Sequence, residues 1–274
     1  MQTVYDREVT LHSRNAQGRN ALTERAGRAA VFYKPAHARK TQPGAWRRLA
    51  AVALCCGALL CAFRLYGRAR SRFGVQLPVR TVLQNPELPN GCEITSCCEV
   101  LHYLGFAPDK CELADHYLPR SAQWYGADPD EVYMGNPHLD DGSPETGYYC
   151  FAGPIVQAAN AYLAVQGSSC RAYDLTGAEE AELASQLQAG NPVIFWATLH
   201  FGDIQHDPCG EYDLPGGRRH EVLHTLHCMV LCGMDDQNFV VADPLDFNRV
   251  VPRVQFMKIY RQLGRRAVVI KKDS

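Results

Sequence analysis

The stretch Gln84-Asn85-Pro86-Glu87-Leu88-Pro89-Asn90-Gly91-Cys92-Glu93-Ile94-Thr95-Ser96 decides the fold, because a loop changes into a buried helix within it. Its two prolines and its Asn-Gly pair are incompatible with a helix over the first half. Apolar side chains then recur at helical spacing, and a stop signal follows at Gly105: Ile94, Cys97, Cys98, Leu101 and Leu104. The pattern predicts a buried helix that begins at or beside Cys92.

Cys92 is the candidate nucleophile. At the start of a helix, unpaired backbone N–H groups and the helix dipole both favour a thiolate over a thiol. A lone cysteine in this position is nevertheless more often a small apolar side chain. Residues farther along the chain must therefore decide between the two interpretations.

Charge is distributed unevenly along the 274 residues, although 28 Lys and Arg nearly balance 29 Asp and Glu. Residues 1–48 carry ten basic and three acidic side chains, whereas residues 81–274 carry 13 basic and 26 acidic ones. The acidic C-terminal part argues against a nucleic-acid partner. Residues 1–44 are polar and aperiodic, and we predict a flexible basic tail there.

Residues 49–63 form an uncharged apolar run with arginines on both sides. Fifteen helical residues span about 22 Å, less than the roughly 30 Å hydrocarbon core, but Trp46, Leu65 and Tyr66 lengthen the run. We predict a transmembrane signal anchor over residues 45–66 and a basic linker over 67–78. A cleaved signal peptide and a buried helix are the alternatives. Equal basic flanks leave the orientation open, and carbonate extraction tests the anchor itself.

Residues 79–274 are predicted to form one globular domain of the α+β class, because helical patterns come first and strand patterns later. The patterns predict helices over 92–104, 108–118, 154–163 and 178–189, and strands over 192–199, 226–234, 239–242, 250–254 and 267–270. The segments 119–150 and 201–219 are predicted to be loops. The twelve cysteines of the chain show no paired CxxC spacing, which argues against a structural zinc site.

His227 and Asp243 are candidates for a base and for the group that orients it. His227 opens one predicted strand of a hairpin, and Asp243 closes the returning strand. A regular two-residue turn would place them on opposite faces of the hairpin, because side chains alternate along a strand. A β-bulge or an odd-length loop is required to bring them together. In a ladder without a bulge, Asp246 would face His227 instead.

Two further motifs bear on the chemistry. Gln84 could donate its amide to an oxyanion, with Asn85 as the rival for that role. The run His220-Glu221-Val222-Leu223-His224 matches HExxH, the zinc-hydrolase helix motif. That motif needs a long helix and a third ligand, whereas strand-like sequence follows it here. We interpret it as a solvated polar segment and predict no metal.

The motifs together resemble a known family. The set is Gln84 with Pro86 to Glu93, Gly135-Asn136-Pro137, Gly190-Asn191-Pro192, His227 to Gly233 and Ala242-Asp243-Pro244. It is similar to stand-alone peptidases related to the bacteriocin-processing, double-glycine-cleaving cysteine peptidases of the papain-like superfamily. The resemblance covers roughly residues 79–270. It implies Cys92 as nucleophile, His227 as base, Asp243 as orienting residue and Gln84 as oxyanion donor, with no metal or organic cofactor.

The predicted anchor and the resemblance together predict a membrane-anchored cysteine peptidase acting on peptides or proteins. The position of its catalytic domain outside the cell membrane is implied by the resemblance alone. Two alternatives stay open. One is an amidase or acyltransferase that acts on cell-wall peptides with the same triad. The other is a catalytically silent, tethered binding domain. The transporter and ATPase segments of leader-processing exporters are absent from this sequence, so bacteriocin maturation does not follow.

Overall fold

The computed structural model describes residues 49–50, 52–59, 61 and 74–273. The described residues between 49 and 61 are helical and exposed. Among the described residues, no helix has both the length and the apolar character needed to cross a membrane. The rest of the predicted anchor, the basic tail and most of the linker lie outside the described residues, so these three assignments stay predictions.

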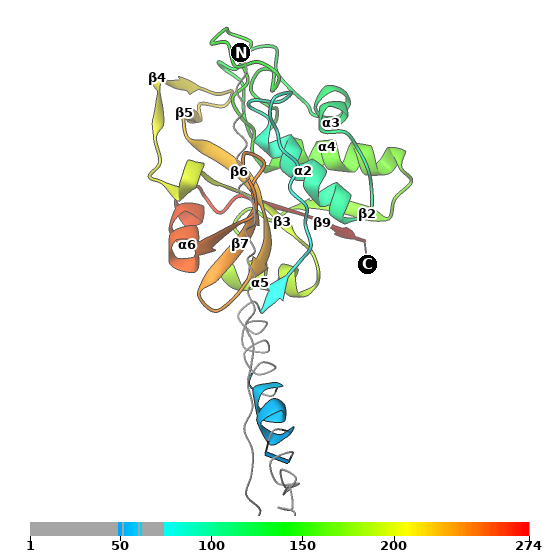
Figure 1. Cartoon of the computed structure of the whole chain (residues 1–274). Coiled ribbons are helices and arrows are strands. Elements are labelled where there is room, and N and C mark those ends of the chain that lie inside the picture. Colours follow the sequence, from blue (N-terminus) through cyan, green and yellow to red (C-terminus); the bar gives the residue numbers. More distant parts are fainter. Residues whose placement is uncertain (1–48, 51, 60, 62–73, 274) are drawn as a thin grey trace, which may run out of the picture. The chain divides into compact units, whose positions relative to one another are not determined.

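Residues 74–273 fold around a seven-stranded antiparallel sheet (Figure 1). The strands run in the order β2-β9-β3-β6-β7-β8, and β1 pairs with β6. Their bounds are β1 Val75–Gln76, β2 Cys170–Asp174, β3 Val193–Thr198, β6 Leu226–Met234, β7 Asn238–Ala242, β8 Arg249–Pro252 and β9 Ala267–Lys272. The α+β prediction therefore matches the observed architecture.

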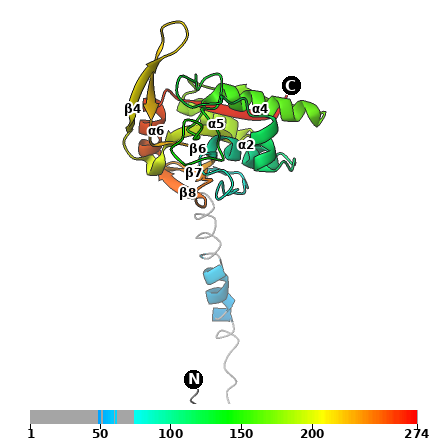
Figure 2. The ribbon, with the colours of Figure 1, turned by 90° about the horizontal axis from the view of Figure 1, so that it is seen from above.

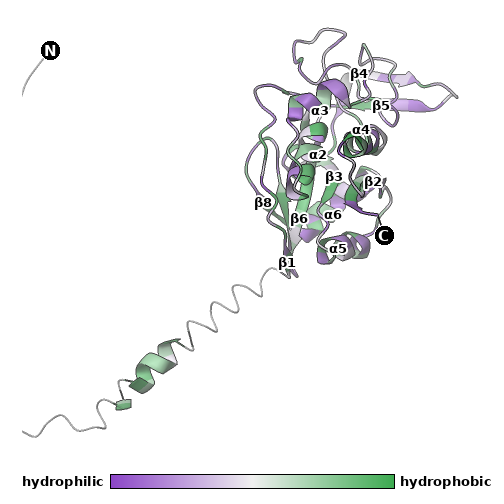
Figure 3. Cartoon of the chain, turned by 90° about the vertical axis from the view of Figure 1, so that its right-hand side faces the viewer, coloured by the Kyte–Doolittle hydropathy of each residue, from purple (hydrophilic) through white to green (hydrophobic). Residues whose placement is uncertain are grey.

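Helices cover both faces of the sheet. They are α2 Cys92–Tyr103, α3 Lys110–His116, α4 Ala152–Val165, α5 Glu180–Gln188 and α6 Arg253–Gln262, with a short η1 at Leu199–Phe201. One core packs α2, α3 and α4 against the sheet, and a second core packs α5 and α6. Along β3, Trp196 enters the first core and Phe195 the second. Figure 3 accordingly shows β3 and β6 as apolar along their length, as expected for strands covered on both faces.

Four stretches differ from the sequence-based prediction. The sequence patterns do not predict β2, and β1 lies within the predicted linker although it pairs with β6. The predicted loop over 201–219 contains β4 (His206–Asp213), which pairs with β5 (Arg219–Leu223) in a separate two-stranded sheet. Figure 2 shows this hairpin extending away from the main sheet. It is fastened to the segment 119–150 by a hydrogen bond from the Tyr212 hydroxyl to the Ala127 carbonyl, 2.6 Å long. The predicted strand over 250–254 ends at Pro252, and α6 follows directly because Phe256, Met257 and Tyr260 pack into the second core.

Candidate active site

Cys92 is the first residue of α2, and Gly91 is its N-cap. A side chain at Gly91 would begin 2.6 Å from the Cβ atom of Leu88, so only glycine lets the preceding loop close this tightly. The Cys92 side chain is 7% exposed and packs over β6, where the backbone N–H of Cys228 donates to Sγ over 3.4 Å. The helix therefore brings the candidate nucleophile to the strand residue that directly follows His227.

His227 and Asp243 are in contact, with 2.7 Å between Nε2 and Oδ1. Both side chains are buried. The contact depends on a β-bulge in the β6–β7 ladder: Gly233 pairs with Val240, but Leu231 pairs with Val241, so Cys232 is an extra residue. The bulge shifts the register by one and puts His227 and Asp243 on the same face.

Asp243 is held by more than the histidine. Its Oδ1 also accepts the Leu245 N–H at 3.0 Å, and its Oδ2 forms an ion pair with Arg249. Burial opposes ionisation of this carboxyl, but the hydrogen bond and charge of His227, the Leu245 N–H and the Arg249 charge together lower its pKa. Asp246, the alternative partner, is exposed, and its backbone N–H donates to the Asp243 carbonyl at 3.1 Å.

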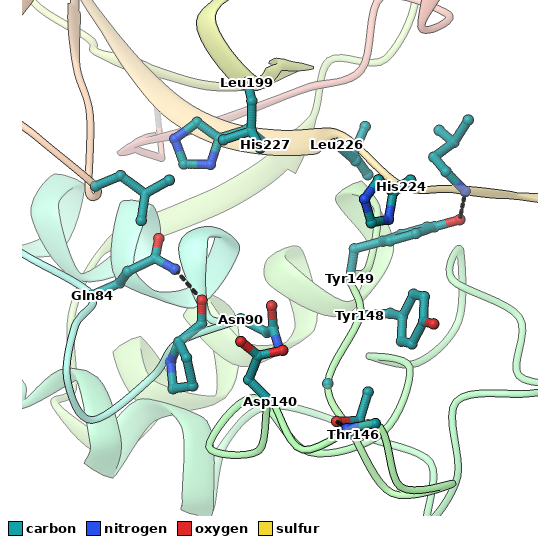
Figure 4. A pocket seen from close by; sticks show the side chains of 15 residues that line it. Gln84, Asn90, Asp140, Thr146, Tyr148, Tyr149, Leu199, His224, Leu226 and His227 are labelled. Carbon is teal, nitrogen blue, oxygen red and sulfur yellow. Dashed lines mark hydrogen bonds between the residues drawn. The ribbon is translucent and has the colours of Figure 1, made fainter. Parts of the chain in front are cut away.

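Gln84 lies beside His227 (Figure 4). Its backbone N–H donates to the Pro244 carbonyl at 2.8 Å, which ties the loop before α2 to the residue that follows Asp243. Its amide Nε2 donates to the Pro89 carbonyl at 2.6 Å, which uses one of its two hydrogens. The rival, Asn85, is exposed and does not line the cavity.

A buried lysine holds this loop in place. Lys110 Nζ donates to the carbonyl oxygens of Leu83 and Gln84 at 2.5 and 2.9 Å, and pairs with Glu87 at 2.7 Å. The cation thereby satisfies two carbonyl groups that flank the Gln84 side chain. Nothing in the sequence around Lys110 indicates this role, because the loop that it holds lies 26 residues away.

A cavity of about 310 Å³ opens beside His227. Leu199 and Leu226 line one side of it, and the polar residues Asn90, Asp140 and Thr146 line the other (Figure 4). Figure 4 shows Tyr148, Tyr149 and His224 between these two sides. Gln84 and His227 line this cavity, whereas Cys92 is not among its lining residues.

The pKa of Cys92 is shifted in the direction opposite to the sequence-based expectation. Burial raises the pKa of the thiol well above its ordinary value, and the neighbouring Glu93 carboxylate raises it further. The helix start is where the sequence placed it, but the prediction that this position favours the thiolate neglected burial and the acidic neighbour. In this structure, the thiol donates a hydrogen bond to Oε2 of Glu93 over 3.3 Å.

The HExxH motif is not helical. Its first four residues belong to β5 (Arg219–Leu223), and His224 lies in the bend that follows, so the two histidines are not one helical turn apart. The prediction of a solvated segment was wrong for His220, which is buried and bonds to the Tyr149 hydroxyl at 2.9 Å. Within the described part of the chain, no group of three or more His, Cys, Asp or Glu side chains is placed to hold a metal ion.

A cysteine at the start of a helix that packs on an antiparallel sheet, together with a buried histidine–aspartate pair, is typical of a cysteine-peptidase-like domain. Residues 76–268 match the model of the Peptidase_C39 like family, and the chain belongs to this family. It is 33% identical over 208 residues to the uncharacterized protein YvpB of Bacillus subtilis strain 168, an alignment that covers 73% of this chain and 78% of that protein.

A solved structure is also similar. The crystal structure of a candidate C39-like peptidase from Bacillus anthracis superposes with a TM-score of 0.63 at 30% sequence identity. The match covers 73% of this chain and 98% of the other. The resemblance inferred from the sequence motifs is therefore confirmed at the level of family and fold.

Proposed function

We propose that this chain is a cysteine peptidase that cleaves peptide bonds with Cys92, His227 and Asp243. The observation that carries the proposal is the buried His227–Asp243 pair, 2.7 Å apart. His227 lies on β6, directly before Cys228, whose N–H donates to the Cys92 sulfur. A histidine oriented by a carboxylate beside a helix-terminal cysteine is the arrangement that nucleophilic catalysis needs. The family match supports a peptide or protein as the substrate.

In the proposed reaction, the Cys92 thiolate attacks the carbonyl carbon of a peptide bond, and the oxyanion accepts hydrogen bonds from the free amide hydrogen of Gln84 and the backbone N–H of Cys92. His227, protonated when the thiolate attacks, gives its proton to the leaving amine; the C–N bond breaks and a thioester remains on Cys92. The neutral imidazole then takes a proton from water as the water oxygen attacks the thioester. The C–S bond breaks, the acyl group leaves as a carboxylic acid, and the Cys92 thiolate and protonated His227 are restored. Asp243 holds the ring throughout, since its Oδ1 contacts Nε2 of His227.

Replacement of the nucleophile tests the proposal. Cys92→Ala should abolish cleavage in a peptide library followed by mass spectrometry, and wild-type protein should accumulate a thioester under acid quench. The matched control is Cys98→Ala, because Cys98 is a buried cysteine of the same helix whose contacts go to His102 and Pro108. Equal loss of cleavage in both variants, or full activity in Cys92→Ala, would contradict the assignment.

A further inference from the structure

Glu93 is a buried carboxyl group in direct contact with the candidate nucleophile. Its side chain is completely buried. One oxygen, Oε2, accepts the Cys92 thiol at 3.3 Å, and the other, Oε1, accepts the backbone N–H of Cys150 at 3.3 Å. The Cys150 peptide is fixed at its other end by Trp196 Nε1, which donates to its carbonyl at 2.8 Å. Each oxygen of the carboxyl group therefore accepts a hydrogen bond, and one of the two donors is the thiol of the candidate nucleophile.

The titratable groups found to interact with Glu93 in the described part of the chain are cysteines and tyrosines. These groups come from α2 itself, from the segment 119–150 and from β6: Cys92, Tyr133, Tyr149, Cys150 and Cys228. A carboxylate buried without a cation is unfavourable, and burial raises the pKa of Glu93 to about 7. Two negative charges, on Oε2 and on Sγ, would repel each other across 3.3 Å.

We propose that Glu93 and Cys92 share one proton, so that the thiolate content of the site stops rising with pH once that pair carries a single negative charge. The S–H bond breaks and an O–H bond to Oε2 forms, while the negative charge moves from the carboxylate to the sulfur. The resulting thiolate is hydrogen-bonded by the new carboxylic acid and by the Cys228 N–H. The inference rests on the proposed function only in taking Cys92 as the nucleophile.

A proton shared by Glu93 and Cys92 gives the thiolate content of Cys92 a distinctive dependence on pH. Below about pH 7 the carboxyl group is neutral, and the thiolate increases tenfold per pH unit as for any thiol. Above that pH, ionisation of Glu93 competes with ionisation of Cys92 for the same proton, so the thiolate reaches a plateau. Glu93→Gln fills the same volume but cannot ionise, and the plateau should disappear.

The experiment measures the rate of iodoacetamide modification of Cys92 between pH 5.5 and 9, by peptide mapping of the folded protein. Wild-type and Glu93→Gln should react at similar rates at pH 6, and the variant should react about tenfold faster at pH 8. Glu99→Gln is the matched control, because Glu99 is also fully buried on α2 but accepts the Val82 N–H instead of a thiol. Its profile should keep the plateau.

A reciprocal measurement does not require Glu93→Gln to fold. Cys92→Ala removes the thiol donor that stabilises the carboxylate, so the carboxyl titration of Glu93 should move to higher pH. Infrared absorption of the protonated carboxyl group reports that titration. Coincident carboxyl titrations in wild type and Cys92→Ala, or coincident alkylation profiles in wild type and Glu93→Gln, would overturn the inference.

The two proposals fail separately. Alkylation measures ionisation of the thiol and needs no peptide hydrolysis, so a shared proton would be detected in a domain without turnover. Conversely, Cys92→Ala could abolish cleavage while wild type and Glu93→Gln show coincident alkylation profiles. That result would support the proposed peptidase activity and contradict the shared proton.

Discussion

At Asp243, three groups converge on one carboxylate: His227 and the Leu245 N–H on Oδ1, and Arg249 on Oδ2. The Arg249 side chain also reaches Nδ1 of His200 at 3.3 Å, so the cation is itself held from a second direction. A carboxylate with both oxygens occupied cannot rotate freely. The orientation of the His227 ring is therefore fixed from behind by residues of the β7–β8 connection and β8.

This geometry predicts unequal effects for the two candidate aspartates. Asp243→Ala should lower kcat/KM by roughly a hundredfold or more, because the buried ring loses its partner. Asp243→Asn should retain measurable activity, since its amide oxygen can still accept from the ring. Asp246→Ala should leave kcat/KM within about twofold, because that side chain is exposed.

Steady-state kinetics of the three variants on one peptide substrate check these values. Loss of turnover in Asp246→Ala with normal turnover in Asp243→Ala would reverse the assignment and imply a β6–β7 register without the bulge.

At the scale of elements, the segment 119–150 is the wall of the cavity, and two glycines determine how it folds. A Cβ atom at Gly135, which has φ +79°, would lie 2.1 Å from the Thr146 carbonyl oxygen. A Cβ atom at Gly147 would lie 2.5 Å from the Asn136 carbonyl oxygen and 2.9 Å from the Tyr133 hydroxyl. That hydroxyl donates to the Asn90 carbonyl at 2.5 Å, two residues before Cys92. The Tyr133 hydroxyl therefore links the segment 119–150 to the loop that precedes Cys92.

Gly147→Ala should therefore affect substrate binding as well as stability. We expect a loss of about 1–3 kcal/mol in the free energy of unfolding, as for other overpacked sites, and a KM increase larger than the fall in kcat. The control is Gly126→Ala on the same segment, where φ is +81° but no atom lies within 4 Å of the added methyl group.

Gly126→Ala should lower the free energy of unfolding by only about 1 kcal/mol, because alanine is disfavoured in a left-handed backbone conformation. Its KM should be unchanged. Urea unfolding and Michaelis–Menten kinetics measure both quantities. A Gly147→Ala protein with the KM of Gly126→Ala would show that the segment does not control binding.

On the scale of the whole domain, stability depends on two carboxyl groups buried on one helix. Burial raises the pKa of Glu99 to about 8, and that of Glu93 to about 7, from 4.5. Between the ordinary value of 4.5 and these raised pKa values, the folded protein binds more protons than the unfolded chain. The free energy of unfolding therefore falls as pH rises through this interval. Asp243 acts in the opposite direction at lower pH, because its folded pKa is depressed and its contribution is lost on acidification.

Glu99→Gln isolates this effect, since Glu99 has no contact with the nucleophile. The free energy of unfolding of the variant relative to wild type should increase from pH 5 to pH 8, by up to about 1.4 kcal/mol per pH unit. Guanidinium unfolding at four pH values in this interval checks the slope. Parallel stability curves for wild type and variant would show that Glu99 does not titrate between the two states.

The sequence by itself determined the local elements and the identity of the family. The loop before Cys92 follows from Pro86, Pro89 and Gly91, and α2 from its apolar spacing, because these signals act within a few residues. The same local reasoning missed α6 and the β4–β5 hairpin. Their apolar side chains are recognisable as buried only when the second core and the segment 119–150 are in place.

The tertiary structure decided which residues meet. Whether Asp243 or Asp246 faces His227 depends on one extra residue at Cys232, and local sequence cannot say which strand of a hairpin carries a bulge. The protonation of Cys92 depends on burial and on Glu93, and burial is a property of the packed molecule rather than of a helix start. Lys110 and Arg249 reach the site from 26 and six residues away in sequence, which only the folded chain can show.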